Sequence, residues 1–307
     1  MRIVNVTTGD TGNQSYGLSK AINEHTRHKS RSFVRQTYFE WSHDVMWRPE
    51  WGGDVPDWIR SYWRGSDIVH LHNRWQRAKY WAESPKAAWI VHQHGRWPDK
   101  DRYAAELAVD RERGAIRVVS TINLLGDVCW NLNRWFPRPI ETVLEVKQQW
   151  GDPLHIIHCP TVQSQKQTPL FVSVMEELKR EYRVTYEVVT KRPHTECIMR
   201  KARADILYDQ LSPCYGTNAL EAWALGIPSV SGLTEQADAF FRENIGRAPY
   251  VQATNRDELK EALERLIRYS GYREYMAQLG NDYVRRWHSP QVCAEIAIRT
   301  YKEAMNI

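Results

Sequence analysis

The 307-residue sequence lacks any apolar run that approaches the roughly 20 residues needed to cross a bilayer. Its opening stretch, MRIVNVTTGD, lacks the charged start and apolar middle of a signal peptide. Internal repeats and low-complexity segments are also absent. We therefore expect a globular protein that stays in the cytoplasm.

Cysteines are few, and their pattern excludes two kinds of site. Their number is odd, they are scattered, and no two form a Cys-x-x-Cys pair. Neither a disulfide framework nor a cysteine zinc site is indicated. We expect reduced thiols at Cys129, Cys159, Cys197, Cys214 and Cys293.

A large charge of one sign is lacking as well, because the formal net charge is only +5. Residues 1–150 contain 22 Lys and Arg against 17 Asp and Glu, whereas residues 151–307 contain 20 of each. Twelve of the fourteen tryptophans also lie in residues 1–150. Such a half can offer cations and stacking faces to a polyanion or a sugar, and it equally fits core tryptophans beneath an ordinary solvated surface.

What the sequence does contain is an alternation of short apolar runs with helical patterns. In the first half, this pattern predicts a helix over residues 15–25 and strands within residues 3–7, 32–36, 66–72, 87–95 and 115–121. In the second half, it predicts strands within 154–160, 182–190, 204–210 and 227–231, and helices within 169–180, 194–203, 218–225, 255–270, 272–288 and 290–307. The alternation is typical of an α/β fold with parallel sheets, helices on both faces, and ligands at the carboxyl ends of the strands.

The division into domains follows from length and from one irregular stretch. At about 150 residues per domain, the chain should hold two lobes. The stretch RWFPRPIETVLEVKQQWGDP has three prolines and no core periodicity, so we place the connection between about Pro139 and Pro153. We predict lobes over residues 1–145 and 146–285, and a C-terminal helix within 286–307 that packs back on the first lobe.

The loop LSPCYGT and the helix that follows it form a candidate anion site. Unpaired N–H groups and the helix dipole attract a phosphate to a helix N-terminus. Gly216 allows close approach of the main chain to a ligand, and Glu221, one turn inside the helix, is placed to accept hydrogen bonds from a ribose. The spacing Asn218-x-x-Glu221 fits a capping box equally well, and spacing alone does not decide between the two.

The run ADILYDQLSPCYGTNALEAWALGIPSVSG resembles the donor-site segment of retaining glycosyltransferases of the GT-B fold, of the family-four type (glycosyl transferases group 1). An aromatic-Gly-x-x-x-Leu-Glu-Ala-x-Ala-x-Gly-x-Pro pattern recurs there. The pieces DIVHLHN, VHQHG, STINLL, WFPRPIE and HCPTVQSQK agree in order, so the resemblance covers most of the chain. It implies two Rossmann-like lobes whose parallel sheets face a central cleft, the first lobe binding the acceptor and the second the nucleotide sugar.

The resemblance also implies the roles of individual residues. Glu221 would bind the ribose hydroxyls, Lys166 would neutralise the diphosphate and the leaving nucleotide, and His94 would touch the donor sugar near its reacting carbon. Without the resemblance, Lys166 fits an ordinary solvated loop lysine. The other donor-binding residues would be Gly12, Asn13, Gln163, Arg192, Asp209, Tyr215, Gly216, Thr217 and Asn218. The loop of Gly9, Asp10, Thr11, Gly12 and Asn13 would cover the sugar and phosphates, although a plain tight turn needs the same residues.

The sequence departs from the family pattern at two places. Pro213 stands where the first carboxylate of a Glu-x7-Glu pair is usual, so Asp209, Gln210 or Asn218 would have to bind the sugar hydroxyls. Gln163 or Ser164 replaces the usual arginine before Lys166, so the diphosphate would rely on Lys166 with Lys191 or Arg192.

His70 and His72 are two residues apart in a predicted strand, and VHQHG contains a second pair of histidines with the same spacing. Two such pairs would hint at a metal site. No acidic ligand stands at a recognisable spacing, so we expect neither a metal nor another cofactor.

The resemblance thus implies a retaining glycosyltransferase, hexosyl or pentosyl, that moves a sugar from a nucleotide diphosphate donor to an acceptor hydroxyl. A UDP-sugar is favoured by its frequency in the family. The acceptor alternatives are a hydroxymethylated base in DNA and a glycan or lipid-linked sugar. A sugar-nucleotide epimerase of the same fold and a non-catalytic DNA-binding relative are the alternative functions.

Overall fold

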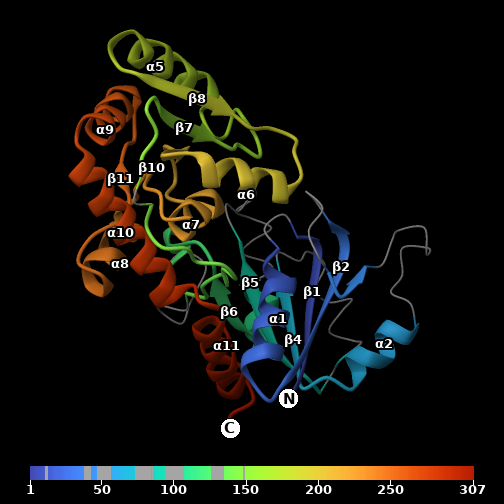
Figure 1. Cartoon of the computed structure of the whole chain (residues 1–307). Coiled ribbons are helices and arrows are strands. Elements are labelled where there is room, and N and C mark those ends of the chain that lie inside the picture. The colour runs from blue at the N-terminus through green and yellow to red at the C-terminus, as the bar shows by residue number, and fades with distance from the viewer. Residues whose placement is uncertain are drawn as a thin grey trace. The chain divides into compact units, whose positions relative to one another are not determined.

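The structure is a computed structural model that describes residues 1–10, 13–37, 43–46, 57–72, 84, 86–94, 107–125, 135–147 and 149–307. The chain divides into unit 1, Met1–Pro139 with His288–Ile307, and unit 2, Ile140–Trp287. Each unit has a parallel sheet with helices packed on it (Figure 1). The predicted α/β class is therefore confirmed.

Unit 1 contains a parallel sheet with the strand order β3-β2-β1-β4-β5-β6. Its strands are β1 (Arg2–Asp10), β2 (Lys29–Thr37), β3 (Val45–Met46), β4 (Ile68–His72), β5 (Ala88–Gln93) and β6 (Ile116–Val119). The helices of unit 1 that the structure describes in full are α1 (Gln14–His25), α2 (Asp57–Arg64), the short η2 (Ile122–Leu124) and α11 (Pro290–Ala304).

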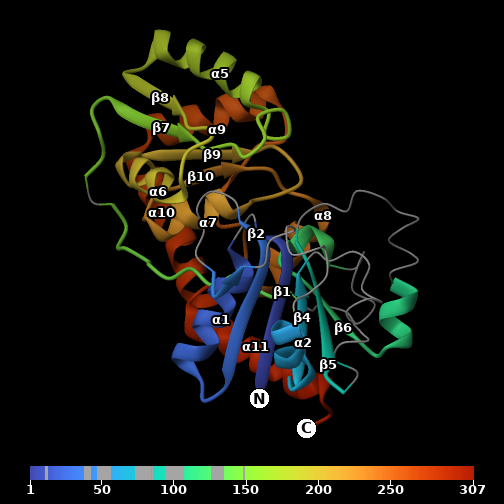
Figure 2. The same ribbon diagram turned by 90° about the vertical axis from the view of Figure 1, so that its right-hand side faces the viewer.

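The two faces of the unit 1 sheet are covered by different helices, because successive strand residues point to opposite faces. Ile3 and Ile68 belong to an apolar cluster with Leu18 of α1 and Ala297 of α11. Their neighbours Val4 and Val69 belong to a second cluster, which includes Ile59 and Trp63 of α2. Helix α11, from the end of the sequence, thus completes the core of unit 1 beside α1 (Figure 2).

Unit 2 contains a parallel sheet with the strand order β11-β10-β9-β7-β8. Its strands are β7 (Leu154–His158), β8 (Val184–Val188), β9 (Ile206–Gln210), β10 (Ser229–Ser231) and β11 (Val251–Gln252). Its helices are α5 (Thr168–Glu181), α6 (His194–Arg203), α7 (Thr217–Ala224), α8 (Glu235–Asn244), α9 (Arg256–Arg268) and α10 (Ser270–Trp287).

Two apolar clusters again separate the faces of the sheet in unit 2. Ile156 of β7 packs in one cluster with Phe171 of α5 and Leu263 of α9. The next residue, Ile157, packs in the other cluster with Ala222 of α7. Helices α6 and α7 therefore approach each other over one face, close to where β7 and β9 end (Figure 1).

Two glycines mark the ends of α7. Gly226 has a φ of 73°, and a Cβ there would collide with the backbone of Glu145, so only glycine fits. At the other end, Gly216 is the N-cap and makes no side-chain cap bond. Asn218 is thus the second residue inside α7, and the capping-box interpretation of Asn218 and Glu221 is wrong. A capping box does exist at α9, where Asn255 Oδ1 accepts from the Glu258 N–H at 3.0 Å.

Most of the first-half tryptophans that the structure describes belong to the core. Trp63, Trp89 and Trp135 are buried, whereas Trp58 on α2 is 52% exposed. The predicted stacking surface depends largely on tryptophans outside the described residues, at positions 41, 47, 51, 75, 81, 97 and 130.

The sequence predicts neither a membrane-spanning helix nor a disulfide, and the structure bears on both predictions only within the described residues. No helix among them has the length and apolar character to cross a membrane. Within the same ranges, Cys159, Cys197, Cys214 and Cys293 form no disulfide, and Cys129 lies outside them.

Candidate functional site

Lys166, Asp209 and Gly216 come together at the carboxyl ends of β7 and β9. Lys166 lies in the turn before α5, and its Nζ donates to Asp209 Oδ1 at 2.8 Å. The other oxygen, Oδ2, accepts from the Gly216 N–H. A Cβ on Gly216 would stand 3.2 Å from both Asp209 Oδ2 and Lys166 Nζ, so glycine leaves room for this close approach.

Asp209 is the partner that holds this arrangement. Its side chain is completely buried, and both of its oxygens accept hydrogen bonds from within the protein. Its carboxylate therefore neutralises Lys166 and aims the Gly216 N–H inward. Because no part of this side chain is exposed, sugar hydroxyls cannot reach Asp209 without a rearrangement, and the carboxylate instead positions the loop.

Glu221 lies on the buried side of α7, with a side chain only 6% exposed. Its Oε1 is 2.9 Å from Nε2 of His194, at the start of α6. Its Oε2 accepts from Nζ of Lys201, in the last turn of α6. A carboxylate has about four acceptor sites, and these two contacts use one site on each oxygen.

The N-terminus of α7 supplies hydrogen-bond donors between the Lys166–Asp209 pair and Glu221. The first-turn N–H groups of Thr217 and Asn218 have no acceptor within the helix, as at every helix start. Asn218 Nδ2 donates to the Cys159 carbonyl at 2.7 Å, and its Oδ1 accepts from Lys201 at 2.5 Å. Lys166 with Asp209 and Lys201 with Glu221 are balanced pairs, so the helix dipole supplies the remaining attraction for an anion.

The other predicted donor-site residues have different surroundings. Tyr215 is buried, and its hydroxyl is 2.7 Å from the Tyr283 hydroxyl, so its ring belongs to the core and only its backbone can face a ligand. Gln163 is exposed in the loop before α5. Arg192 is exposed and lies 3.8 Å from the Glu196 carboxylate. Lys191, next to it, is exposed, and Gln210 donates to the Cys214 carbonyl.

Lys201 and His194 were not identified as site residues from the sequence, although both lie in the predicted helix over residues 194–203. The pattern does contain an indication of Lys201. Cys197, Lys201 and Ala204 recur at spacings of four and three, which places a lysine on the apolar side of the helix. A lysine at such a position needs a buried counter-ion, and Glu221 is the carboxylate it meets.

In unit 1, four histidines from β4 and β5 form a continuous cluster over the sheet face that α11 covers. His70 Nδ1 is 2.8 Å from the Tyr301 hydroxyl of α11, and its Nε2 is 3.1 Å from His92 Nδ1. His72 Nδ1 is 2.9 Å from His94 Nε2. Burial, followed by the charges of neighbouring histidines, lowers the pKa of His70 and of His92 well below the usual value.

The hydrogen bonds fix which nitrogen of His94 carries a proton. Both amide hydrogens of Asn5 are used, because Nδ2 donates to Ser19 Oγ at 3.0 Å and to Ser30 Oγ at 2.9 Å. Asn5 Oδ1 must then accept from His72 Nε2, 2.9 Å away. His72 Nδ1 accordingly accepts from the Nε2–H of His94, whose Nδ1 accepts from the Ser120 hydroxyl at 2.8 Å. Burial, His72 and Arg138 lower the pKa of His94 well below the usual value, so this ring is neutral.

Three of these histidines are a grouping of the kind that holds metal ions. His70, His72 and His92 each offer a ring nitrogen, and the three atoms lie within 4.8 Å of one another. The rings of His70 and His72 are stacked, however, with centroids 4.3 Å apart and planes 17° apart. Lone pairs of stacked rings run side by side instead of converging on one ion. The absence of a metal stays a prediction.

The predicted glycine loop is described only in part. Gly9 and Asp10 form the end of β1, whereas Thr11 and Gly12 lie outside the described residues. Asn13 precedes α1 with a φ of 52°, and its buried Oδ1 has no hydrogen-bond partner within the described ranges. A left-handed asparagine at the start of a helix is a backbone conformation typical of a tight turn.

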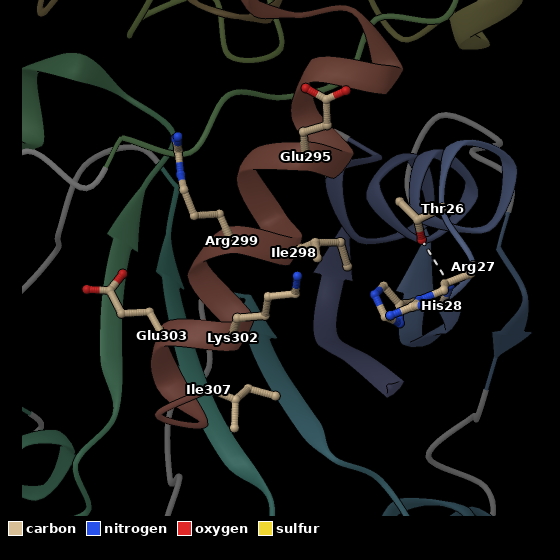
Figure 3. A pocket seen from close by; sticks show the side chains of 9 residues that line it. All are labelled: Thr26, Arg27, His28, Glu295, Ile298, Arg299, Lys302, Glu303 and Ile307. Atoms are coloured by element: carbon tan, nitrogen blue, oxygen red, sulfur yellow. Dashed lines mark hydrogen bonds between the residues drawn. The ribbon is translucent and has the colours of Figure 1, made fainter.

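Unit 1 also has a hollow of about 610 Å³ between the turn after α1 and helix α11 (Figure 3). It lies at the amino ends of β1 and β2, opposite the strand ends where His94 is found. Its lining carries both signs of charge, and in Figure 3 Lys302 points towards Arg27 and His28 while Glu303 points away. Mixed and largely exposed charges do not specify one class of ligand.

Comparison with known proteins identifies the fold. No family model and no curated protein sequence matches this chain. Among solved structures, HepE of Anabaena in complex with UDP aligns with a TM-score of 0.69 and 11% identity, covering 99% of this chain and 100% of that chain. Sucrose-phosphate synthase of Thermosynechococcus elongatus aligns with a TM-score of 0.64 and 15% identity over 100% of both chains. TarM of S. aureus, in a complex that includes UDP, aligns with a TM-score of 0.59 and 10% identity over 79% of this chain and 58% of that chain.

These three are GT-B glycosyltransferases, and the chain described here has the GT-B fold. The fold expected from the sequence is thereby confirmed. At these identities the similarity extends to architecture, and the chemistry has to be argued from the residues themselves.

Proposed function

We propose that this protein is a glycosyltransferase that takes its sugar from a nucleoside diphosphate donor, with UDP as the favoured nucleotide. The observation that carries the proposal is the arrangement at the N-terminus of α7. Lys166 and the Gly216 N–H stand on one side of the first-turn amides, and the Glu221 carboxylate stands one turn inside. A diphosphate matches the cation and the amides, and a ribose matches the carboxylate.

The nucleotide side of the reaction would use unit 2. The diphosphate would lie against the amides of Thr217 and Asn218, and Lys166 would turn from Asp209 towards it. Charge develops on the leaving diphosphate as the sugar–oxygen bond breaks, and a cation with oriented amides stabilises that charge most in the transition state. The complexes of HepE and TarM with UDP support uridine as the nucleoside.

We propose transfer with retention of the anomeric configuration. In this scheme the bond from the anomeric carbon to the diphosphate oxygen breaks while the acceptor oxygen bonds to the same face. The acceptor proton passes to the departing diphosphate oxygen, so no side chain has to act as the base. The state of His94 is compatible with this scheme, because both of its ring nitrogens lie in hydrogen bonds and the ring is neutral.

The acceptor would bind unit 1. We keep the two acceptor classes predicted from the sequence, a hydroxymethylated base in DNA and a glycan or lipid-linked sugar. Retention of duplex DNA that weakens steeply with salt would favour the first class, because release of counterions makes phosphate contacts salt-dependent. Transfer to a duplex with hydroxymethylated bases, compared with the unmodified duplex, would then identify the accepting hydroxyl.

The decisive experiment is a thermal-shift panel of UDP, GDP and ADP, followed by their sugars. A ligand at about 100 times its Kd stabilises the native state by about 2.7 kcal/mol. We expect UDP to give the largest rise in midpoint. We expect Glu221→Gln to lose most of the rise, because it removes the charge that receives the ribose hydroxyls.

Glu274→Gln is a matched control, since Glu274 is an exposed carboxylate on α10 of the same unit. It should respond to UDP as the wild type does. A Glu221→Gln protein with unaltered UDP affinity would remove Glu221 from the site. Product formed from a nucleotide sugar without any acceptor would identify an epimerase instead of a transferase.

A further inference from the structure

Lys201 is a buried lysine that contacts Glu221 of the proposed nucleotide site. Its side chain is 1% exposed, although it stands in the last turn of α6 between two exposed or half-buried arginines, Arg200 and Arg203. Lysines are almost never fully buried unless they are paired. Its position therefore needs an explanation in terms of its partners.

Both partners of Lys201 belong to the ligand-facing start of α7. Its Nζ donates to Glu221 Oε2, and the same atom donates to Asn218 Oδ1 at 2.5 Å. Asn218 is anchored in turn to the Cys159 carbonyl. One ammonium thus fixes two side chains of α7 and holds α6 against it.

The charge of Lys201 follows from the same contacts. Burial lowers its pKa, but the Glu221 carboxylate, together with Cys159 and Cys197, more than compensates, so the net shift of the Lys201 pKa is upward. The pair is therefore an ammonium and a carboxylate. Without the ammonium, a carboxylate as buried as Glu221 would favour its neutral form, which accepts hydrogen bonds from hydroxyls less strongly.

His194 completes the placement of Glu221 from the opposite side. Its ring is 25% exposed, and its Nε2 holds Oε1 at 2.9 Å. Lys201 and His194 together hold one oxygen each, so the plane of the carboxylate is defined by α6. The remaining lone pairs of both oxygens then have fixed directions.

We infer that Lys201 is a positioning residue for ribose recognition: its ammonium keeps Glu221 ionised and oriented so that the carboxylate accepts the ribose hydroxyls of the donor. This inference rests on the proposed function, since it concerns the same site. Lys201 does not touch the nucleotide in this scheme. A purely structural ion pair would instead only hold α6 to α7.

A positioning role and a purely structural role of Lys201 predict different effects on the recognition of the ribose hydroxyls. We would measure the affinities of UDP and 2′,3′-dideoxy-UDP, which share base and diphosphate and differ in the ribose hydroxyls. Hydrogen bonds to a charged group make a difference of about tenfold or more, so we expect the wild type to prefer UDP by at least that factor. Lys201→Met should bring this ratio near one while leaving the affinity for 2′,3′-dideoxy-UDP within about twofold.

A double-mutant cycle shows whether Lys201 acts through Glu221. In a Glu221→Gln background, adding Lys201→Met should leave the ratio unchanged, because the acceptor that Lys201 controls is already altered. Arg200→Met is the matched control, since it removes a cation from the next position of α6, where Arg200 pairs with Glu196 and Glu187. It should keep the wild-type ratio.

If Lys201→Met does not fold, Lys201→Gln takes its place, because it keeps two N–H donors and loses the charge. A ratio well below that of the wild type would support the inference. A wild-type ratio in either folded variant, or an equal loss of affinity for both nucleotides, would overturn the inference about Lys201. The proposed function would still stand, because the wild-type protein would bind UDP. A wild-type protein that binds neither nucleotide would overturn the proposed function instead.

Discussion

The Lys166 ammonium lies 2.8 Å from Asp209, and the same carboxylate accepts from the Gly216 N–H. Asp209 thus occupies the two donors that a diphosphate would use. Asp209 keeps the Lys166 ammonium and the Gly216 N–H close enough together to bind one anion. It also places its own buried negative charge next to that anion.

Replacing Lys166 tests its proposed role in the reaction. Lys166→Ala should reduce kcat about 100-fold or more, because a preorganised cation next to developing charge has an effect of this size. The loss of kcat should be larger than the loss of one hydrogen bond would cause. Without Lys166, Asp209 would remain as a carboxylate without a counter-ion beside the diphosphate. Initial rates of donor consumption measure the effect.

Lys179→Ala is the control for this measurement. Lys179 is an exposed lysine on α5, 3.5 Å from Glu176, and it lies outside the site. Its replacement should leave the rates unchanged. A Lys166→Ala enzyme with wild-type kinetics would exclude Lys166 from the reaction.

The buried pair of Lys201 and Glu221 should also be visible in stability. Lys201→Met leaves a buried carboxylate without a counter-ion, which typically costs about 3–5 kcal/mol of unfolding free energy. The double variant Lys201→Met with Glu221→Gln removes both charges and should recover most of that loss. Urea unfolding of the single and double variants measures it. Strictly additive losses would show that the two charges do not depend on each other.

A pH dependence of stability is expected from His158 in β7. Its Nδ1 is 3.0 Å from the Tyr208 carbonyl and its Nε2 is 2.9 Å from the Thr168 hydroxyl, and burial lowers its pKa to about 4. Because the native pKa is below the unfolded value of about 6.5, the unfolded state binds the proton first as the pH falls. The contribution is fully present above pH 6.5 and is lost between about pH 6.5 and 4, with a slope of up to about 1.4 kcal/mol per pH unit.

His158→Gln should make the unfolding free energy less dependent on pH in this range. The measurement is the midpoint of urea unfolding, followed by fluorescence at several pH values between 7 and 4. His155→Gln is a suitable comparison, because His155 stands in the same strand with its side chain 28% exposed. It should leave the slope as in the wild type. An unchanged slope in His158→Gln would assign the dependence to other groups.

The sequence predicted the parts of this protein that depend on local pattern. Strands such as Leu154–His158 and Ile206–Gln210 are apolar runs between polar turns, and Gly226 and Pro228 stand shortly after the end of the helix from Thr217 to Ala224. The motif around Gly216 and Glu221 located the candidate site because glycine and carboxylate have to stand at fixed positions along the chain.

The partners of those residues could not be predicted in the same way. Asp209 was expected among the sugar ligands, yet its carboxylate is buried on Lys166, from a turn 43 residues earlier. Lys201 and His194 reach Glu221 across the space between two helices, which depends on how α6 packs on α7. Such contacts depend on tertiary packing, which no local pattern encodes.

The histidine cluster allows a test for metal binding. We expect Zn²⁺ or Ni²⁺ to leave the thermal midpoint unchanged, because the stacked rings of His70 and His72 do not aim their lone pairs at one point. A saturable rise in midpoint that disappears in His92→Gln would contradict this expectation. His92 is the informative residue because its buried Nε2 has no hydrogen-bond partner within the described ranges.

The chain of hydrogen bonds from Asn5 to His94 makes a prediction about protonation that needs no substrate. Asn5 Oδ1 fixes the proton of His72 on Nε2, and His72 Nδ1 then fixes the proton of His94 on Nε2. We expect ¹⁵N chemical shifts to show the Nε2–H tautomer for both rings, unchanged from pH 8 to 6, since the pKa of His94 is well below the usual value.

Asn5→Leu should remove that control. It leaves a buried donor of His72 without its acceptor, which costs about 1–3 kcal/mol, and it lets His72 and His94 exchange tautomers. Ser66→Ala is a comparison from the same unit, because Ser66 donates only to the Trp63 carbonyl before β4 and has no part in the histidine chain. Tautomers that stay fixed in Asn5→Leu would show that Ser120, at the far end of the chain, sets the state of His94 by itself.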